Sequence, residues 1–246
     1  MGTPSVQSSL SIYASCPVRL PCLLTRPSPG LRFGPIGRRP SPRGSVFIQV
    51  IQGQVTNPDA LRAELDRWKA ELRPGADGWL GCTSGVTDDG RFIAVVRFAS
   101  EELARRNSDR PEQDAWWSQA SKHLAAVAFH DSTRVHTYRE GGSDQAGFVQ
   151  VIQGYSPDME RLAALGRARE QTMAEQAPHI LGMTVAEHAD RRGDFTQTVY
   201  FTSQQEARWF GREQPVEFDP SFAEFSSLMT EVRYFDLRDP RLDSPG

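Results

Sequence analysis

The sequence predicts an α+β fold made of two tandem βαββαβ units, and two observations carry this prediction. The segment Phe47–Gly53, FIQVIQG, recurs as Phe148–Gly154, FVQVIQG, with six of seven positions identical. A spacing of about a hundred residues is too long for a solenoid repeat and suits a duplicated small domain. Each occurrence also opens the same order of predicted elements, which is the split βαβ pattern of ferredoxin-like folds.

The first copy is predicted to span residues 46–141. Its apolar, β-branched run 47–53 is typical of a strand. Asn57-Pro58-Asp59 then supplies an N-cap, a proline at the first helical position and an acid in the first turn, so we expect a helix, which ends at Gly75. Two strands, 78–86 and 91–98, follow as a hairpin around Asp88-Asp89-Gly90.

The rest of the first copy is predicted to be helical until its last strand. Ser100 caps a short helix that breaks at Arg110-Pro111, and a second helical piece runs to about Ala126. Residues 134–138 close the copy as a strand.

The second copy, residues 147–240, repeats this order after a linker at 142–146. Its predicted elements are a strand at 148–154, a helix capped at Ser156-Pro157-Asp158, a hairpin of 180–187 with 195–201, a helix from Ser203 that is interrupted at Pro215 and restarts at Asp219-Pro220, and a strand at 232–237. Because neither face of the first strand is charged in either copy, both faces should be buried, and we expect the two sheets to cover each other.

Residues 1–45 differ from the rest of the chain, since they are rich in proline and hold six arginines but no acidic residue. Such a segment cannot bury enough apolar surface to offset its chain entropy, so we expect a disordered extension. One interpretation is a transit peptide. The other, which we favour, is upstream sequence preceding a true start at Val46.

Composition limits the classes of function. The chain has 246 residues, 38% hydrophobic and 24% charged, with a net charge of -3, which fits a soluble globular protein of one or two domains. The near-neutral charge argues against a nucleic-acid partner, and no apolar run is long enough for a membrane span. Three cysteines, Cys16, Cys22 and Cys82, form neither a disulfide framework nor a zinc site, so we expect a cytoplasmic protein.

With this strand order and a proline-broken second helix, residues 46–238 resemble the dimeric α+β barrel superfamily, and within it the antibiotic biosynthesis monooxygenase (ABM) domains. The resemblance implies an intramolecular pseudo-dimer, monomeric as a chain, with a ligand cavity between sheet and helices. It also implies a small aromatic or hydrophobic substrate and an oxygenase without metal or flavin, so no cofactor is expected.

The candidate site lies at the predicted helix break of the first copy. Asn107 and Arg110 could stabilise a developing oxyanion, while Trp116 stacks on a flat substrate. Trp117 is a candidate ligand contact, although adjacent helical residues should not face the same surface. The structural alternative has one indole in the core, the other between the copies, and Arg110 paired with a neighbouring Asp. The second copy lacks this arrangement, so we expect any pocket in the first.

Three further residues are candidate ligand contacts. Gln49 and Gln52, like Gln150 and Gln153 in the second copy, are amides in apolar strands that either line a cavity or bond to backbone or to each other between the copies. His130, with His123, is predicted near the end of the second helix, where it faces a cavity or serves as a surface or capping residue. Haem-degrading relatives use an iron-ligating histidine, but we expect no haem binding here.

Two functions follow from these residues. One is a cofactor-independent monooxygenase acting on an aromatic or hydrophobic substrate in the first-copy pocket. The alternative is a non-catalytic barrel that is structural or binds a small hydrophobic ligand. They differ in whether Asn107, Arg110 and one of Trp116 and Trp117 converge on a cavity of at least roughly 300 Å³.

Overall fold

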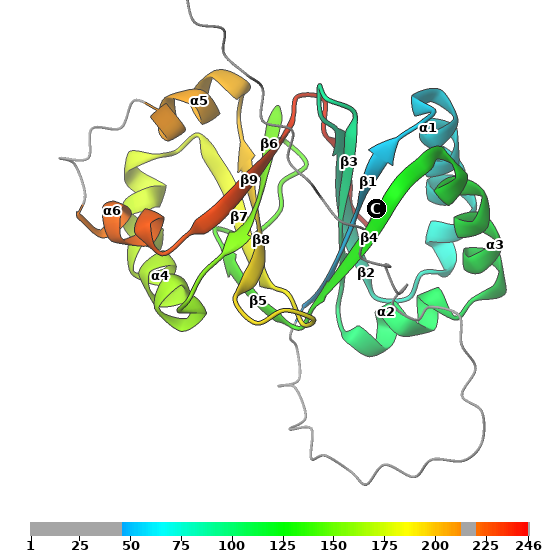
Figure 1. The fold of residues 1–246 in the computed structure, drawn as a ribbon, viewed down its shortest axis with the longest axis horizontal. Helices are drawn as coiled ribbons and strands as arrows, with labels where there is room; N and C mark the ends of the chain where they lie inside the picture. Colours follow the sequence, from blue (N-terminus) through cyan, green and yellow to red (C-terminus); the bar gives the residue numbers. More distant parts are fainter. Residues whose placement is uncertain (1–45, 213–219, 246) are drawn as a thin grey trace, which may run out of the picture. The chain divides into compact units, whose positions relative to one another are not determined.

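The computed structural model describes residues 46–212 and 220–245 and contains two antiparallel sheets with helices (Figure 1). The predicted extension 1–45 and the predicted helix break at Pro215 lie outside the described residues. In chain order the helices and strands are β1 Phe47–Val55, α1 Pro58–Arg67, β2 Trp79–Val86, β3 Arg91–Phe98, α2 Glu101–Ser108, α3 Pro111–Ala120, β4 Leu124–Ser132, β5 Arg134–Tyr138, β6 Phe148–Tyr155, α4 Met159–Gln176, β7 Ile180–Glu187, β8 Asp194–Phe201, α5 Gln204–Arg212, α6 Pro220–Ser227, β9 Thr230–Leu237 and β10 Arg241–Asp243. The helix begun by α1 continues as a π turn, Trp68–Leu72, and a 3₁₀ turn that ends at Gly75.

The two sheets have the same topology. The first has the order β10-β2-β3-β1-β4, and the second has the order β5-β7-β8-β6-β9. Without the outermost strands β10 and β5, each is the four-stranded sheet of a ferredoxin-like unit. The predicted fold class, α+β with two tandem βαββαβ units paired within one chain, is confirmed.

Each copy also donates a short strand to the sheet of the other copy. β5 follows the last strand of the first copy and pairs with β7, while β10 follows β9 and pairs with β2. Since β2 and β7 are equivalent strands, the exchange is symmetric. It covers an edge of each sheet whose backbone groups would otherwise lack partners.

The last strand of the first copy was wrongly predicted. Residues 124–132 form β4, which pairs with β1, whereas 134–138 belongs to the second sheet. The helix therefore ends at Ala120 rather than near Ala126, and His130 lies on a strand. The alanine-rich sequence of this segment favours a helix locally, but backbone pairing with β1 decides its conformation.

The sheets pack face to face through an apolar core. Ile48 and Val50 on β1 meet Val149 and Val151 on β6, all fully buried, and Leu237 joins them. The outer face of the first sheet is covered by α1, α2 and α3, and that of the second by α4, α5 and α6 (Figure 1). The prediction that both faces of the repeated strand are buried is confirmed for its apolar residues except Ile51, which is half-buried.

The helix caps follow the sequence. The Oδ1 atom of Asn57 accepts a hydrogen bond from the Ala60 N–H, and Ser100 and Asp158 cap α2 and α4 in the same way.

Replacing Asn57 by alanine should lower the free energy of unfolding by about 1 kcal/mol, because the N–H loses its acceptor. Urea denaturation measures this. Asn57→Asp, which keeps an acceptor, should retain most of the stability, and an equal loss in both variants would contradict the capping role.

Candidate functional site

A small cavity lies between the first sheet and the helices α1 and α3. Its volume is about 100 Å³. Most of its wall is apolar, and four indoles contribute to it: Trp68, Trp79, Trp116 and Trp117. The ring centroids of Trp68 lie 5.5 Å from Trp79 and 6.4 Å from Trp116, so the indoles form a continuous aromatic wall. Such walls bind flat apolar rings.

Both tryptophans of the predicted helix break contribute to this wall. Trp116 is buried, and its N–H donates to the Glu64 carbonyl at 2.8 Å. Trp117, half-buried, meets Phe129 of β4 edge-on at 5.3 Å. Both indoles line the same cavity, although adjacent helical residues point about 100° apart.

Asn107 lines the cavity and has a defined orientation. Arg110 Nη1 donates to the Oδ1 atom of Asn107 at 3.0 Å. Because a guanidinium can only donate, the amide must present its oxygen to Arg110, and its NH₂ group remains as the donor that Asn107 can offer to a ligand. The residue as a whole is buried, at 8% exposure.

Arg110 itself is placed differently from the prediction. It is not among the residues that line the cavity. Its guanidinium donates to the Leu72 carbonyl and pairs with the Glu112 carboxylate at 2.8 Å. The structural alternative for Arg110, an ion pair with a neighbouring acid, therefore holds, with Glu112 in place of an Asp. Arg110 positions Asn107 and does not face the ligand space.

The cavity wall also holds a buried donor without a partner. The Nε1 atom of Trp79 is shielded from solvent and has no hydrogen-bond partner. A buried N–H left unpaired costs about 1–3 kcal/mol, so an acceptor on a ligand would be stabilised there. Trp68, in contrast, donates to the Oε1 atom of Gln113 at 2.8 Å, which leaves the Gln113 NH₂ group as a further donor in the wall.

A wider cleft of about 600 Å³ adjoins the cavity. The two share five lining residues: Leu61, Leu65, Ser84, Phe92 and Arg241. The cavity alone is smaller than the roughly 300 Å³ expected of a ligand pocket, and Arg110 does not line it. The criterion for an enzyme pocket is therefore not met by the cavity itself, and the adjoining cleft only adds open volume next to it.

The exchanged strand β10 forms one wall of this space. Arg241 Nε pairs with Asp243 at 2.7 Å, and its Nη1 reaches Asp66 of α1. Asp243, largely buried, also pairs with Lys69, and these cations hold the pKa of its carboxyl below its usual range despite burial. The C-terminal end of the second copy thus closes the pocket of the first copy with an ion-pair network.

The thiol of Cys82 in the cavity wall should be unreactive. Burial raises its pKa to about 12, so the thiolate is scarce at neutral pH. We expect peptide mass spectrometry to show no alkylation of Cys82 by iodoacetamide at pH 8 in the folded protein, and full alkylation in urea. Alkylation of the native protein at the rate of a free thiol would contradict the raised pKa of this thiol.

The first glutamine of the repeat has an equivalent partner in both copies. Gln49 lines the cavity and donates to Asp131 on β4, and Gln150 donates to Asp236 on β9, both at 2.9 Å. Neither bonds to the backbone or to its counterpart in the other copy. Each joins the repeated strand to the neighbouring closing strand.

Gln52 and His130 do not reach the cavity. Gln52 alternates with Gln49 along β1 and therefore lies on the face toward the second sheet, where its amide meets the Nε2 atom of His130 at 3.4 Å. The structure thus brings together Asn107, Trp116, Trp117 and Gln49, but not Arg110, Gln52 or His130. Of the predicted ligand contacts, Gln49 and Trp117 thus lie at the cavity, whereas Gln52 and His130 lie on the face toward the second sheet.

Comparison with solved structures identifies the fold. The chain matches a putative monooxygenase from Lactobacillus acidophilus NCFM with a TM-score of 0.64 and 12% identity, covering 82% of this chain and 97% of that one. The chain also matches a putative monooxygenase from Fusobacterium nucleatum subsp. nucleatum with a TM-score of 0.64 and 7% identity, covering 82% of this chain and 96% of that one. This chain has their fold. An anthrone oxidase-like protein matches with a TM-score of 0.59 and 13% identity, covering 80% and 93%.

The expected α+β fold of paired ferredoxin-like units is therefore confirmed at the level of structure. No family model matches the sequence, and no curated protein matches it either. Among the described residues, no helix is long and apolar enough to span a membrane.

Sequence reasoning missed several residues of the wall. Trp79 was assigned only to a strand and Trp68 only to the apolar face of a helix. Their shared position is a consequence of packing between β2 and the π turn after α1, and the only signal in the sequence was the unusual number of tryptophans in one copy. No pattern in the sequence indicates that Arg241 and Asp243 lie at the pocket, since they reach it only through strand exchange.

Proposed function

We propose that the first-copy pocket binds a flat, largely apolar aromatic molecule carrying a carbonyl or phenolic oxygen, and that the chain acts on it as a monooxygenase. The observation that carries this proposal is the unpartnered N–H of Trp79 in a wall of indoles. The cavity of about 100 Å³ is smaller than the roughly 150 Å³ apolar space that accepts benzene in another protein, so the lining side chains would have to move for one ring of the ligand to enter. The remaining rings would extend into the cleft.

The donors in the wall suggest how such a ligand is activated. The Trp79 N–H and the Asn107 amide can donate to a ligand oxygen, and donors directed at an oxyanion stabilise the enolate or phenolate of an aromatic ketone or phenol. That electron-rich form is the one that reacts with O₂. For an anthrone, the CH₂ carbon is oxidised to a carbonyl as O₂ is consumed, giving an anthraquinone and one water. The names of the structural neighbours favour this class of reaction.

Adding an anthrone to the protein tests the proposal, with binding measured by tryptophan fluorescence and O₂ uptake measured by an oxygen electrode. We expect saturable quenching of tryptophan fluorescence and O₂ uptake above the uncatalysed rate. Trp79→Phe and Asn107→Leu should each weaken binding about tenfold, the equivalent of one lost hydrogen bond of about 1.4 kcal/mol. The matched control Gln150→Leu replaces an exposed amide of the second copy and should leave affinity unchanged.

The second candidate, a barrel that binds a small hydrophobic ligand without turning it over, shares the apolar wall. Saturable binding without O₂ uptake would favour it over the monooxygenase. No binding, or equal weakening by all three substitutions, would overturn the assignment of the pocket.

A further inference from the structure

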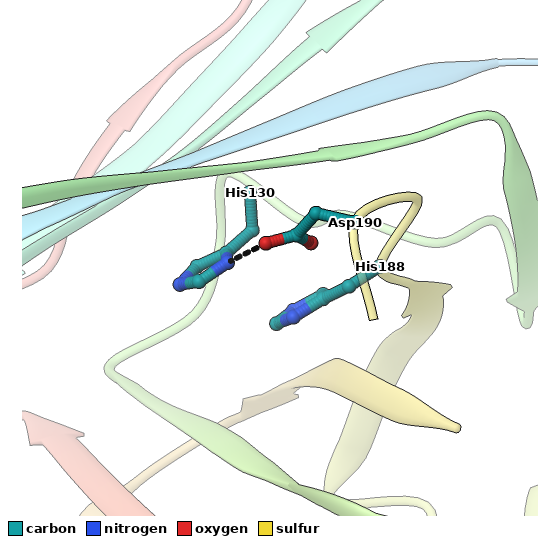
Figure 2. Close-up of side chains that lie close together, drawn as sticks. All are labelled: His130, His188 and Asp190. Carbon is teal, nitrogen blue, oxygen red and sulfur yellow. Dashed lines mark ion pairs between the residues drawn. The ribbon is translucent and has the colours of Figure 1, made fainter. Parts of the chain in front are cut away.

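Two histidines from different copies stack on each other between the sheets. The ring of His130, on β4, lies 4.3 Å from that of His188, which follows β7, and the ring planes differ by only 9°. Asp190 completes the group, with its Oδ2 atom 3.6 Å from His130 Nδ1. Figure 2 shows the carboxylate of Asp190 beside the two parallel rings.

The Nδ1 atom of each ring lacks a hydrogen-bond partner. His188 is only 6% exposed; its Nε2 atom lies 2.7 Å from the Thr196 hydroxyl, and its Nδ1 atom has no partner. The Nε2 atom of His130 likewise meets Gln52, and its Nδ1 atom is buried without a hydrogen bond.

The glutamines of the sequence repeat lie next to both rings, one in direct contact and one through a threonine. Gln52 contacts His130 directly, and its repeat equivalent Gln153 donates to Thr196, the partner of His188, at 3.3 Å. The Oε1 atom of Gln52 is buried without a partner. Rotating this amide by half a turn would let Oε1 accept from His130 Nε2–H, and this tautomer exposes the lone pair of Nδ1. Histidines that bind metals characteristically donate their other N–H in this way.

The backbone fixes the loop that carries His188 and Asp190. The Ala189 N–H donates to the Asp131 carbonyl of β4 at 2.8 Å, and the His188 N–H donates to the Asp194 carbonyl at 2.8 Å. The first bond joins the loop directly to the strand of His130. The three side chains are therefore held together by main-chain structure on both sides.

We propose that His130, His188 and Asp190 bind one divalent transition-metal ion between the two copies. One nitrogen of each ring and one oxygen of the carboxylate already lie within 4.8 Å of one another. Ligands at about 2.0–2.2 Å from a tetrahedral zinc are roughly 3.4 Å apart, so the atoms need to close by up to about 1.4 Å. The two parallel rings must also turn so that a lone pair of each points at the same ion. The Asp190 side chain, 54% exposed, is free to rotate inward.

The ligand types define the class of ion. Imidazole nitrogens suit zinc, copper, iron and nickel, whereas magnesium and calcium prefer oxygen ligands alone. Two imidazoles and one carboxylate leave at least one coordination position for water or a small ligand. This site is separate from the aromatic pocket, since His130 and Gln52 lie on the opposite face of the first sheet from Gln49.

Titration of the tag-free full chain with Co²⁺ and Zn²⁺ tests the proposal. Calorimetry measures the binding of each ion, and visible absorption reports the coordination of Co²⁺. We expect one ion per chain, a rise in Tm with Zn²⁺ and no such effect of Mg²⁺. His130→Gln and Asp190→Asn, chosen because these side chains are partly exposed, should each lower the affinity at least 100-fold. Gln52→Leu should lower it about 10–100-fold by releasing His130.

His123→Gln is the matched control, because it removes an imidazole of the same copy outside the group, and it should bind like the natural chain. Circular dichroism of each variant establishes that it is folded. Absence of a bound ion in the natural chain would overturn the proposal. So would binding that survives in both His130→Gln and Asp190→Asn, since the ion would then lie elsewhere.

Discussion

Replacing Leu237 by alanine should lower the free energy of unfolding by about 2–5 kcal/mol. Leu237 lies on β9 of the second copy and is 1% exposed in the core between the sheets. It packs so closely on Gly85 of β2 that a β-carbon there would stand 3.0 Å from its Cδ2 atom. The substitution leaves a void that neither sheet can readily close, and urea denaturation measures the loss.

The same variant tests whether the copies unfold as one unit. Four of the five tryptophans lie in the first copy, so fluorescence reports mainly on that copy, while circular dichroism reports on both. Both midpoints should shift together although Leu237 belongs to the second copy. Tyr234→Ala, at a side chain 53% exposed on the same strand, should change stability by less than about 0.5 kcal/mol. A shift confined to circular dichroism would contradict a common core.

Replacing Tyr200 by phenylalanine should cost about 1.5–3 kcal/mol, although no packing volume is lost. The buried hydroxyl of Tyr200 lies 2.7 Å from Thr83 Oγ1 and accepts from Arg97 Nη1 at 2.8 Å. Both partners belong to the first copy, so this network joins the copies. Burial raises the pKa of Tyr200 and keeps its hydroxyl protonated, and either hydroxyl can donate in the bond between Tyr200 and Thr83.

A double-mutant cycle with Thr83→Val separates the network from general destabilisation. Arg97 also donates to Thr83 at 3.1 Å, so the three groups act together and the two losses should not add. Tyr234→Phe removes an exposed hydroxyl and should have almost no effect. Strictly additive losses for Tyr200→Phe and Thr83→Val would show that the hydroxyls act separately.

Much of the fold could be predicted from local sequence signals. The repeat, the Asp88-Asp89-Gly90 turn and the caps at Asn57 and Ser100 mark elements whose bounds agree with the structure within a few residues. The exchange of β5 and β10 could not be predicted, because which sheet a short strand joins depends on contacts between distant segments. The three residues of β10 carry no strand signal of their own.

The candidate site was predictable only in part. The helix break at Pro111 pointed to Asn107, Trp116 and Trp117, and the structure brings all three to one cavity, where their roles remain predictions. Arg110 was misplaced because its partners, the Leu72 carbonyl and Glu112, depend on how α3 packs against the end of the first helix. His130 was misplaced because an alanine-rich strand resembles a helix.

We expect a ligand in the aromatic pocket of the first copy to accept a hydrogen bond from the free N–H of Trp79. The ¹H–¹⁵N spectrum of the indole groups tests it most directly, since the five tryptophans give five assignable signals. On addition of an anthrone, the Trp79 signal should move downfield by more than any other, because it alone gains a hydrogen bond. The signal of Trp116, already bonded to the Glu64 carbonyl, should move less. An unchanged Trp79 signal at saturating anthrone would contradict this expectation.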